Sequence, residues 1–397
     1  MKWSMELIVM KLKLKRIKNG RQNVEQVKEL LDSRSGDNLA KYRKIAADII
    51  KNVQKNGDQA VLDYTSRFDG VEFKASELEV TEAEIEAAMK QVDQDFINAL
   101  KNAAANIEDF HAEQKDKSWQ KQKKPGIITG QVCRPLKKAG VYVPGGRAAY
   151  PSSVLMTVIP AKVAGVEEIV MLTPPDKEGK VSPVILAAAE IAGADRIFKV
   201  GGAQAVAAAA YGTATIPGVD IIVGPGNIYV SMAKELVFGQ VKIDMIAGPS
   251  EIMIMAEKDS NPAYIAADLM SQAEHDPLAS SILVTDAPEL IEKVEKELAE
   301  QIEKMSKKEI IKESLENFGL MIEVKNQEAA MEMINLVAPE HLELAVKDPF
   351  ELLPAVENAG SIFLGEYTPE PIGDYYAGPN HVLPTNSTAR FFSPLSV

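Results

Sequence analysis

The sequence predicts an α/β fold with two Rossmann-like, doubly wound domains that lack a GxGxxG motif and follow a helical N-terminal extension. Two observations predict this class. Residues 22–130 carry apolar side chains at helical spacing, and from residue 137 onward short β-branched runs alternate with helical segments. This alternation is typical of a parallel sheet covered by helices. A chain of 397 residues is long enough for two or three domains.

Composition narrows the classes of function. Lys and Arg number 44 against 57 Asp and Glu, and the net charge of −13 argues against a broad nucleic-acid surface. Cys133 is the one cysteine, which excludes an internal disulfide, and we interpret it as an ordinary thiol. The sequence has no apolar run of 18 residues and no clear secretory signal, so we expect a cytoplasmic protein without a membrane or nucleic-acid partner. The basic stretch 11–21 is expected to be a solvated arm.

Helical spacing in the first third of the chain predicts helices over residues 42–56 and 58–68. Thr81 begins another helix as its N-cap, with Glu84 completing a capping box. A further long helix is expected to run toward Trp119, with His111 on its surface.

Four short apolar runs in the middle of the chain predict strands buried on both faces: 141–143, 168–172, 196–200 and 220–223. Helices are expected between and after them, over 152–164, 182–192, 203–211 and 229–238. Every run ends in a Gly- or Pro-rich turn. Because ligands bind at the carboxyl ends of parallel strands, where helix N-termini offer N–H groups to phosphate, these turns predict a cofactor site.

A second α/β region follows residue 256. Strands are predicted over 281–285, 320–324 and 361–364, and helices over 289–305 and 327–336. The final stretch, 366–397, has no periodicity, which is typical of a functional or docking segment.

Gln272 and His275 end a helix that begins at Asn261 and Pro262. Their i, i+3 spacing places an amide oxygen and an imidazole on one face, where they could bind zinc. A capping histidine that hydrogen-bonds to a glutamine is the alternative.

Glu340 and His341 follow Pro339, which predicts a short helix with both residues in its first turn. The positive end of a helix would keep His341 neutral, as a general base requires. Two constrained turns add further candidates: Asp374 and His381 in the Gly/Pro-rich segment 372–385, and Ser250 in the turn 247–251.

Seven motifs occur in a fixed order: VPGG (143–146), GGAQA (201–205), GPGN (224–227), AGPSE (247–251), SQAEH (271–275), PEHL (339–342) and GPNHVLPT (378–385). In this combination the chain closely resembles histidinol dehydrogenases, from roughly residue 25 to its end. The resemblance implies a zinc-dependent, NAD-linked four-electron oxidation of L-histidinol to L-histidine through L-histidinaldehyde. It also implies a homodimer with one zinc ion per subunit.

Residue roles follow from the resemblance. Gln272, His275 and Asp374 match the family's zinc ligands, and zinc there mainly orients the substrate. His341 matches the base that takes the alcohol proton, and Glu340 matches the residue that activates water against the aldehyde.

The remaining matches are binding residues. Substrate contacts are expected from Ser250, Gln272, His275, His341, Asp374 and His381. NAD contacts are expected from Tyr142, Gln204 and Asn227, in agreement with the strand-end turns.

Four segments are expected along the chain. They are an N-terminal arm and helix (1–34), a discontinuous α/β domain carrying zinc and the catalytic residues (35–140 plus 250–385), an inserted NAD-binding domain (141–249), and the remnant of a C-terminal tail (386–397). Family members continue for a few dozen residues more, with a histidine as fourth zinc ligand and a substrate-contacting glutamate that reach the partner's site.

Other interpretations stay open. One is a related zinc- and NAD-dependent alcohol dehydrogenase that acts on another small polar alcohol. Another is an inactive fragment of the family. A non-catalytic, two-lobed binder of small molecules is the third, and the intact Glu340 and His341 argue against it.

Overall fold

The chain divides into two units, each built on its own parallel sheet. The computed structural model describes residues 12–18, 24–34, 39–145 and 150–397. The six-stranded unit comprises Met1–Gly36, Gly248–Gly373 and Leu383–Pro394. The five-stranded unit comprises Asp37–Ala247, Asp374–Val382 and Leu395–Val397. Among the described residues, no helix is both long and apolar enough to cross a bilayer.

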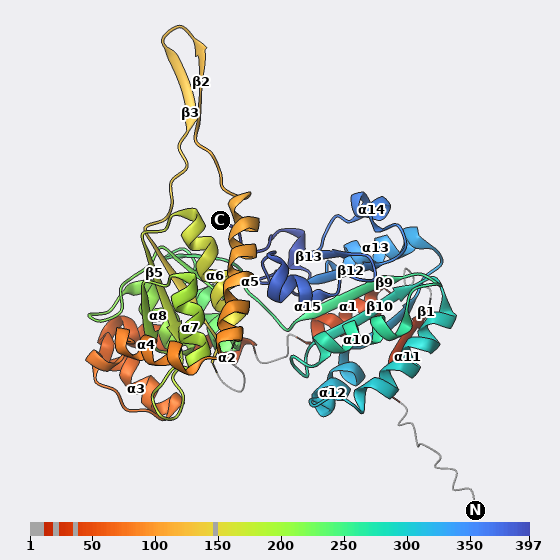
Figure 1. Cartoon of the computed structure of the whole chain (residues 1–397), viewed down its shortest axis with the longest axis horizontal. Helices are drawn as coiled ribbons and strands as arrows, with labels where there is room; N and C mark the ends of the chain where they lie inside the picture. Colours follow the sequence, from red (N-terminus) through yellow and green to blue (C-terminus); the bar gives the residue numbers. More distant parts are fainter. Residues whose placement is uncertain (1–11, 19–23, 35–38, 146–149) are drawn as a thin grey trace, which may run out of the picture. The chain divides into compact units, whose positions relative to one another are not determined.

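The five-stranded unit, coloured mostly from orange to green in Figure 1, contains a doubly wound parallel sheet in the order β6-β5-β4-β7-β8. Its strands are β4 (Lys138–Tyr142), β5 (Glu168–Thr173), β6 (Arg196–Lys199), β7 (Ile221–Val223) and β8 (Lys242–Ile243). The strand order reverses between β4 and β7, which pair in parallel through Ala139 and Ile221. Such a reversal leaves a crevice at the carboxyl ends of the two strands.

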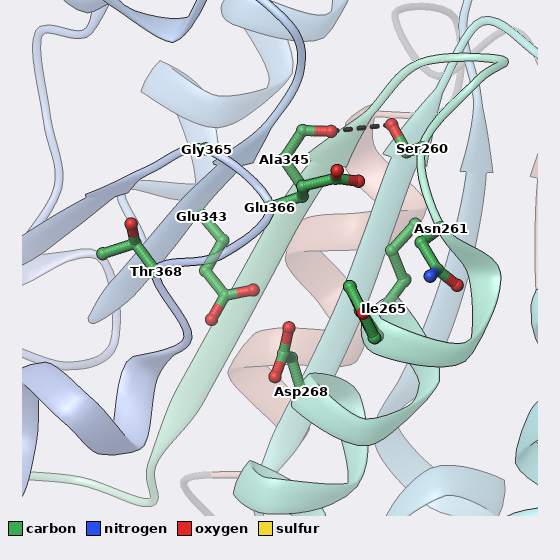
Figure 2. Close-up of a pocket in the computed structure, with 10 residues that line it drawn as sticks. Ser260, Asn261, Ile265, Asp268, Glu343, Ala345, Gly365, Glu366 and Thr368 are labelled. Atoms are coloured by element: carbon green, nitrogen blue, oxygen red, sulfur yellow. Dashed lines mark hydrogen bonds between the residues drawn. The ribbon is translucent and has the colours of Figure 1, made fainter.

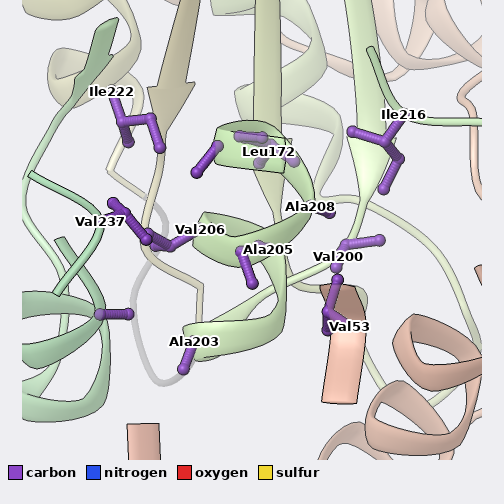
Figure 3. Close-up of a cluster of buried hydrophobic side chains, with 14 of the residues drawn as sticks. Val53, Leu172, Val200, Ala203, Ala205, Val206, Ala208, Ile216, Ile222 and Val237 are labelled. Carbon is purple, nitrogen blue, oxygen red and sulfur yellow. The ribbon is translucent and has the colours of Figure 1, made fainter. Parts of the chain in front are cut away.

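Helices on this sheet are α2 (Leu39–Asn56), α3 (Asp58–Asp69), α4 (Glu82–Gln91), α5 (Gln94–Ala112), α6 (Pro151–Ala164), α7 (Pro183–Ala192), α8 (Gly202–Tyr211) and α9 (Ile228–Val237). The predicted capping box is confirmed: Thr81 Oγ1 accepts from the Glu84 N–H, and the Glu84 carboxylate accepts from the Thr81 N–H. Helix α8 is almost entirely buried and rich in alanine, so neighbouring elements pack closely around it (Figure 3).

The expected grouping of residues 35–140 with 250–385 was wrong for most of its length. Residues 37–140 cluster with residues 141–247, and so do residues 374–382. The reason is packing: Ile49 and Val53 of α2 share a buried cluster with Val206 of α8. On the other side of the sheet, Leu100 of α5 packs with Leu155 of α6. Residues 386–397 do not form a separate segment either, because 383–394 cluster with the six-stranded unit.

The long helix expected to reach Trp119 ends instead at Ala112, and an antiparallel hairpin follows it. The hairpin pairs β2 (Trp119–Lys124) with β3 (Ile127–Gln131) around Pro125 and Gly126, and every residue of both strands is exposed. A run of Lys and Gln without an apolar face gave no strand signal.

His111 was expected on the surface but is fully buried. Its Nδ1 lies 2.6 Å from Gln114 Oε1, and the Asn380 amide donates to its Nε2 at 3.2 Å. Burial lowers the pKa of the His111 imidazole. Asn380 also donates to the Met156 carbonyl at 2.7 Å, so the histidine anchors a C-terminal segment to the five-stranded unit.

The six-stranded unit contains a parallel sheet in the order β1-β11-β10-β9-β12-β13. Its strands are β1 (Lys15–Lys18), β9 (Glu251–Ala256), β10 (Ser280–Thr285), β11 (Gly319–Glu323), β12 (His341–Ala345) and β13 (Ser361–Leu364). Its helices are α1 (Val24–Ser33), α10 (Pro262–Ala273), α11 (Pro288–Ile302), α12 (Lys308–Phe318), α13 (Gln327–Val337), α14 (Pro349–Leu352) and α15 (Glu370–Ile372). Here the strand order reverses between β9 and β12.

The N-terminal basic stretch is not wholly a solvated arm. Residues 15–18 form β1, an edge strand parallel to β11, and the side chain of Ile17 in this strand is buried. Arg16 pairs with Glu295 of α11. Residue 11 and residues 19–21 of that stretch lie outside the described residues.

Candidate active site

Glu340 and His341 meet Glu251 where β9 and β12 begin. The Glu251 N–H donates to Glu340 Oε2 at 2.8 Å, and the Glu251 carbonyl lies 2.9 Å from His341 Nδ1. His341 Nδ1 and Glu340 Oε2 are 3.8 Å apart. Because one residue of β9 holds both side chains, the structure brings the two predicted catalytic residues together at the amino end of the sheet.

The short helix expected at Pro339 is absent, and the helix-dipole argument for a neutral His341 falls with it. His341 instead begins strand β12, in register with Ile252 and Ser361 on its two neighbours. A carbonyl oxygen can only accept, so His341 Nδ1 must carry the proton. In the neutral ring Nε2 is then the basic nitrogen, which suits a general base.

A buried ion pair fixes Glu251 itself. Arg34, at the end of α1, pairs with Glu251 Oε1, and both residues are 3% exposed. The Glu251 carboxylate also accepts the Asn386 N–H at 3.1 Å and the Glu340 N–H at 3.4 Å. Ser250 precedes Glu251, and its carbonyl accepts the Ser280 N–H at 3.0 Å.

Gln272 and His275 are in contact at the end of α10, as their spacing predicts. The Gln272 amide nitrogen lies 3.1 Å from His275 Nδ1. Gln272 is fully buried, and its Oε1 has no hydrogen-bond partner among the described residues. A buried amide oxygen without a donor is expensive in an apolar interior, and beside an imidazole it fits a divalent cation of the zinc type.

Glu370, which the sequence reasoning missed, links these two groups of side chains. The Ser271 hydroxyl, next to Gln272 in α10, donates to Glu370 Oε2 at 3.1 Å. A carboxylate oxygen of Glu370 and a ring nitrogen of His341 lie within 4.8 Å of each other. A Glu between Pro369 and Pro371 was the available signal.

A small cavity lies at the opposite, carboxyl end of the six-stranded sheet. Its volume is about 10 Å³, room for about one water molecule. Asp268 of α10 and Glu343 of β12 line it and point into it (Figure 2). Burial raises the pKa of Asp268 to about 6, and burial together with the Asp268 charge raises the pKa of Glu343.

Tyr142, Gln204 and Asn227, the predicted cofactor contacts, line one cavity at the carboxyl ends of β4, β5 and β6 and before α9. This carboxyl-end cavity measures about 760 Å³, within the range of small-molecule sites. The Gly202 N–H donates to the Tyr142 hydroxyl at 3.0 Å, and burial raises the pKa of Tyr142 to about 12. Gln204 is 1% exposed, and its Oε1 lacks a partner within the described part of the chain.

The side chain of Asn227 caps the N-terminus of α9. Its Oδ1 accepts from the N–H groups of Tyr229 and Val230, at 3.0 and 3.2 Å. The preceding turn is held by a buried ion pair of Lys234 and Asp244. The Lys234 ammonium donates to the Gly224 carbonyl at 2.9 Å, and the Asp244 carboxylate accepts the Gly224 N–H at 2.8 Å.

Asp374 and His381 share one segment of the five-stranded unit. His381 Nδ1 lies 3.0 Å from the Asp374 carbonyl, and Asp374 is 7% exposed. Asp374 directly follows Gly373, the last residue of a stretch of the six-stranded unit. Cys133 is partly buried, and its backbone N–H donates to the Ser118 hydroxyl at 2.9 Å.

Comparison with known proteins agrees with these observations. The family model for histidinol dehydrogenase matches residues 32–397. A histidinol dehydrogenase of Clostridium acetobutylicum is 57% identical over 381 residues, covering 96% of this chain and 88% of the relative. One of Lactococcus lactis is 51% identical over 374 residues, covering 94% and 87%. The crystal structure of histidinol dehydrogenase from Elizabethkingia anophelis superposes with a TM-score of 0.90 at 35% identity, covering 97% of this chain and 88% of that one.

The protein is therefore an α/β oxidoreductase built on two parallel sheets. It belongs to the histidinol dehydrogenase family.

Proposed function

We propose that this chain oxidises L-histidinol to L-histidine through L-histidinaldehyde, consuming two NAD and one water per histidinol. The observation that carries the proposal is the contact of His341 Nδ1 with the Glu251 carbonyl, 2.9 Å away. It sets the ring so that Nε2 is basic, with the Glu340 carboxylate beside it. Family membership supplies the substrate class.

In the first oxidation His341 acts as general base. The hydroxyl proton of the alcohol moves to His341 Nε2 as hydride leaves the carbon, and the imidazolium keeps its Nδ1 proton on the Glu251 carbonyl. Bound NAD would accept the hydride. Burial of His341, which is 2% exposed, excludes bulk water from this proton transfer.

In the second oxidation Glu340 acts as base toward water. Its Oε2 is held by the Glu251 N–H, so the carboxylate is oriented before substrate arrives. The carboxylate removes a proton as the water oxygen adds to the aldehyde carbon. The hydrate would then give the hydrogen on its carbon as hydride to a second NAD and lose one hydroxyl proton, which leaves the carboxylic acid.

We assign zinc to Gln272, His275 and Asp374. Support comes from the unpartnered Gln272 oxygen and the His275 imidazole in contact with the same amide. When bound, zinc would orient the imidazole and amine of the substrate as a Lewis-acid template. We expect Gln272→Ala to lower zinc content in elemental analysis, whereas the exposed Gln94→Ala should retain it.

NAD is assigned to the carboxyl-end cavity, with contacts from Tyr142, Gln204 and Asn227. Ser250 and His381 are assigned to the substrate, alongside Gln272, His275, His341 and Asp374. The unpartnered oxygen of Gln204 supports the NAD assignment, because a carboxamide NH₂ or a hydroxyl could satisfy it.

We also infer a cytoplasmic homodimer. The hairpin β2–β3 exposes Trp119 and Ile128, and a lone two-stranded hairpin is marginally stable in water. Light scattering behind size-exclusion chromatography tests this, since a monomer at micromolar concentration would contradict it.

The deciding assay combines the protein with zinc, NAD and L-histidinol and follows NADH. Two NADH per histidinol, with L-histidine as product, is the expected result. Turnover of other small alcohols but not of histidinol would instead identify a related alcohol dehydrogenase. Absence of turnover in zinc-loaded protein would contradict the proposal.

A further inference from the structure

We propose that Asp69 is a specificity residue of the carboxyl-end cavity, whose carboxylate accepts hydrogen bonds from the hydroxyls of a cofactor ribose. This inference rests on the proposed use of NAD and goes beyond the three expected contacts. It assigns the sugar of the dinucleotide to a residue outside the sheet.

Asp69 is the last residue of α3 and lines the cavity together with Tyr142 and Gln204. Its Oδ2 is buried and has no hydrogen-bond partner in the part of the chain that the structure describes. Gln204 Oε1, in the same cavity, is also buried without a hydrogen-bond partner among the described residues. The cavity therefore presents two buried acceptors that no described donor satisfies.

The position of the Asp69 carboxylate is electrostatically unfavourable. It sits at the C-terminus of α3, where the helix dipole disfavours negative charge, and Gly70 closes the helix with its N–H on the Ser66 carbonyl. The nearby Arg67 guanidinium lies over the Phe68 ring, 5.5 Å from its centroid. Burial raises the pKa of Asp69 to about 6, so the group is still ionised at neutral pH.

An ionised carboxylate only accepts, so its partner must bring donors. The carboxyl-end cavity is lined by aromatic and proline side chains, which favour flat rings, and it has the volume of a small-molecule site. Two adjacent hydroxyls of a ribose can donate to one carboxylate, a pairing that other dinucleotide-binding proteins use. A ribose that carries a phosphate would instead bring a second negative charge against Asp69.

The test measures binding without turnover. We compare the parent with Asp69→Asn and with Asp63→Asn, which makes the same change at an exposed position of the same helix. Calorimetric titration with NAD, AMP and NADP gives dissociation constants, and circular dichroism verifies that each variant is folded. We expect the dissociation constant for NAD to rise about tenfold or more in Asp69→Asn and to change less than about twofold in Asp63→Asn.

Comparing NAD, AMP and NADP shows which of the two riboses of NAD contacts Asp69. If AMP weakens in parallel with NAD and NADP tightens, Asp69 binds the adenosine ribose. If NAD weakens while AMP does not, Asp69 binds the nicotinamide ribose. Both outcomes support the proposal.

Two results would overturn it in distinguishable ways. Equal NAD affinity of the parent and Asp69→Asn, in a parent that binds NAD, removes the ribose assignment and leaves the proposed function intact. A parent that neither binds NAD nor reduces it with histidinol removes the proposed function and this inference with it.

Discussion

The two units use opposite ends of the same kind of sheet. In the five-stranded unit the carboxyl-end cavity opens where the strand order reverses, beside Tyr142 at the end of β4. In the six-stranded unit Glu251 and His341 begin β9 and β12, so the proposed catalytic residues Glu340 and His341 lie at the amino ends of these two strands. Backbone turns therefore shape one site and strand-borne side chains the other.

The difference teaches what each end can do. Carboxyl ends open onto helix N-termini and small-residue turns, which suit a large dinucleotide. In the six-stranded unit the cavity at that end, lined by Asp268 and Glu343 among others, measures about 10 Å³. Its amino end instead gives buried side chains whose orientation is fixed by backbone hydrogen bonds.

The largest expected effect separates chemistry from cofactor binding. His341→Asn should lower the rate of alcohol oxidation by about 10²–10⁴-fold, because the base is lost, and leave the dissociation constant for NAD unchanged. Glu340→Gln should mainly slow oxidation of added histidinaldehyde. Stopped-flow NADH formation with each substrate measures both. If His341→Asn weakened NAD binding as strongly as it slowed turnover, the proposed separation of catalytic residues and cofactor cavity between the two sheets would be wrong.

The next largest effect concerns the buried ion pair of Arg34 and Glu251, which contacts the proposed catalytic residues. Arg34→Met leaves the Glu251 carboxylate buried without its cation and should lower the free energy of unfolding by roughly 3–5 kcal/mol. Arg34→Met with Glu251→Leu should recover part of the loss. The exposed pair supplies the control, since Arg16→Met should cost less than about 1 kcal/mol. Equal losses in urea titrations of the two single variants would contradict a special role for Arg34.

A smaller effect is expected in the turn behind Tyr142. Gly224 has φ +108°, and a Cβ there would overlap the Tyr142 carbonyl oxygen. Gly224→Ala should therefore lower stability by about 2–3 kcal/mol and weaken NAD binding, while zinc content stays unchanged. Gly239→Ala is the matched control, because Gly239 has φ +100° but nothing within 4 Å of its Cβ position. Identical NAD affinities for the two variants would show that the turn does not shape the cavity.

The smallest expected effect is the loss of folding stability caused by the buried carboxylate of Asp69. The pKa of Asp69 is raised to about 6 in the folded protein, above its unfolded value near 4. The unfolded chain ionises first, so stability contributed by this group is lost as pH rises from about 4 to 6. Asp69→Asn should thus be more stable than the parent at pH 7.5 by about 1 kcal/mol, with the side chain's partial solvation limiting the gain, and should match it near pH 4. Thermal melts at both pH values decide, and a gain of the same size at pH 4 would refute the assignment.

Much of the fold could be predicted from the sequence because its strands are buried on both faces. The runs 168–172 and 196–200 are continuous and apolar, and they become β5 and β6 with little change in bounds. The β2–β3 hairpin has no buried face and so no periodic signal. The grouping of residues 35–140 depends on packing between segments far apart in sequence, which local patterns do not contain.

The candidate site divides in the same way. Gln272 and His275 are one helical turn apart, so local spacing predicted their contact. His341 depends on strands β9 and β13, and Pro339 by itself suggested a helix. Glu370 meets Ser271 across 99 positions, a contact that no local pattern encodes.

The Arg34–Glu251 pair has a consequence for the order of folding. Its partners lie 217 positions apart, and the whole of residues 37–247 intervenes. Closing so long a loop is entropically costly, whereas most of the five-stranded unit is one continuous stretch. We expect the carboxyl-end cavity to form first during refolding. Catalytic activity should appear in a slower phase, when α1 packs on the six-stranded sheet and Arg34 pairs with Glu251 at the start of β9.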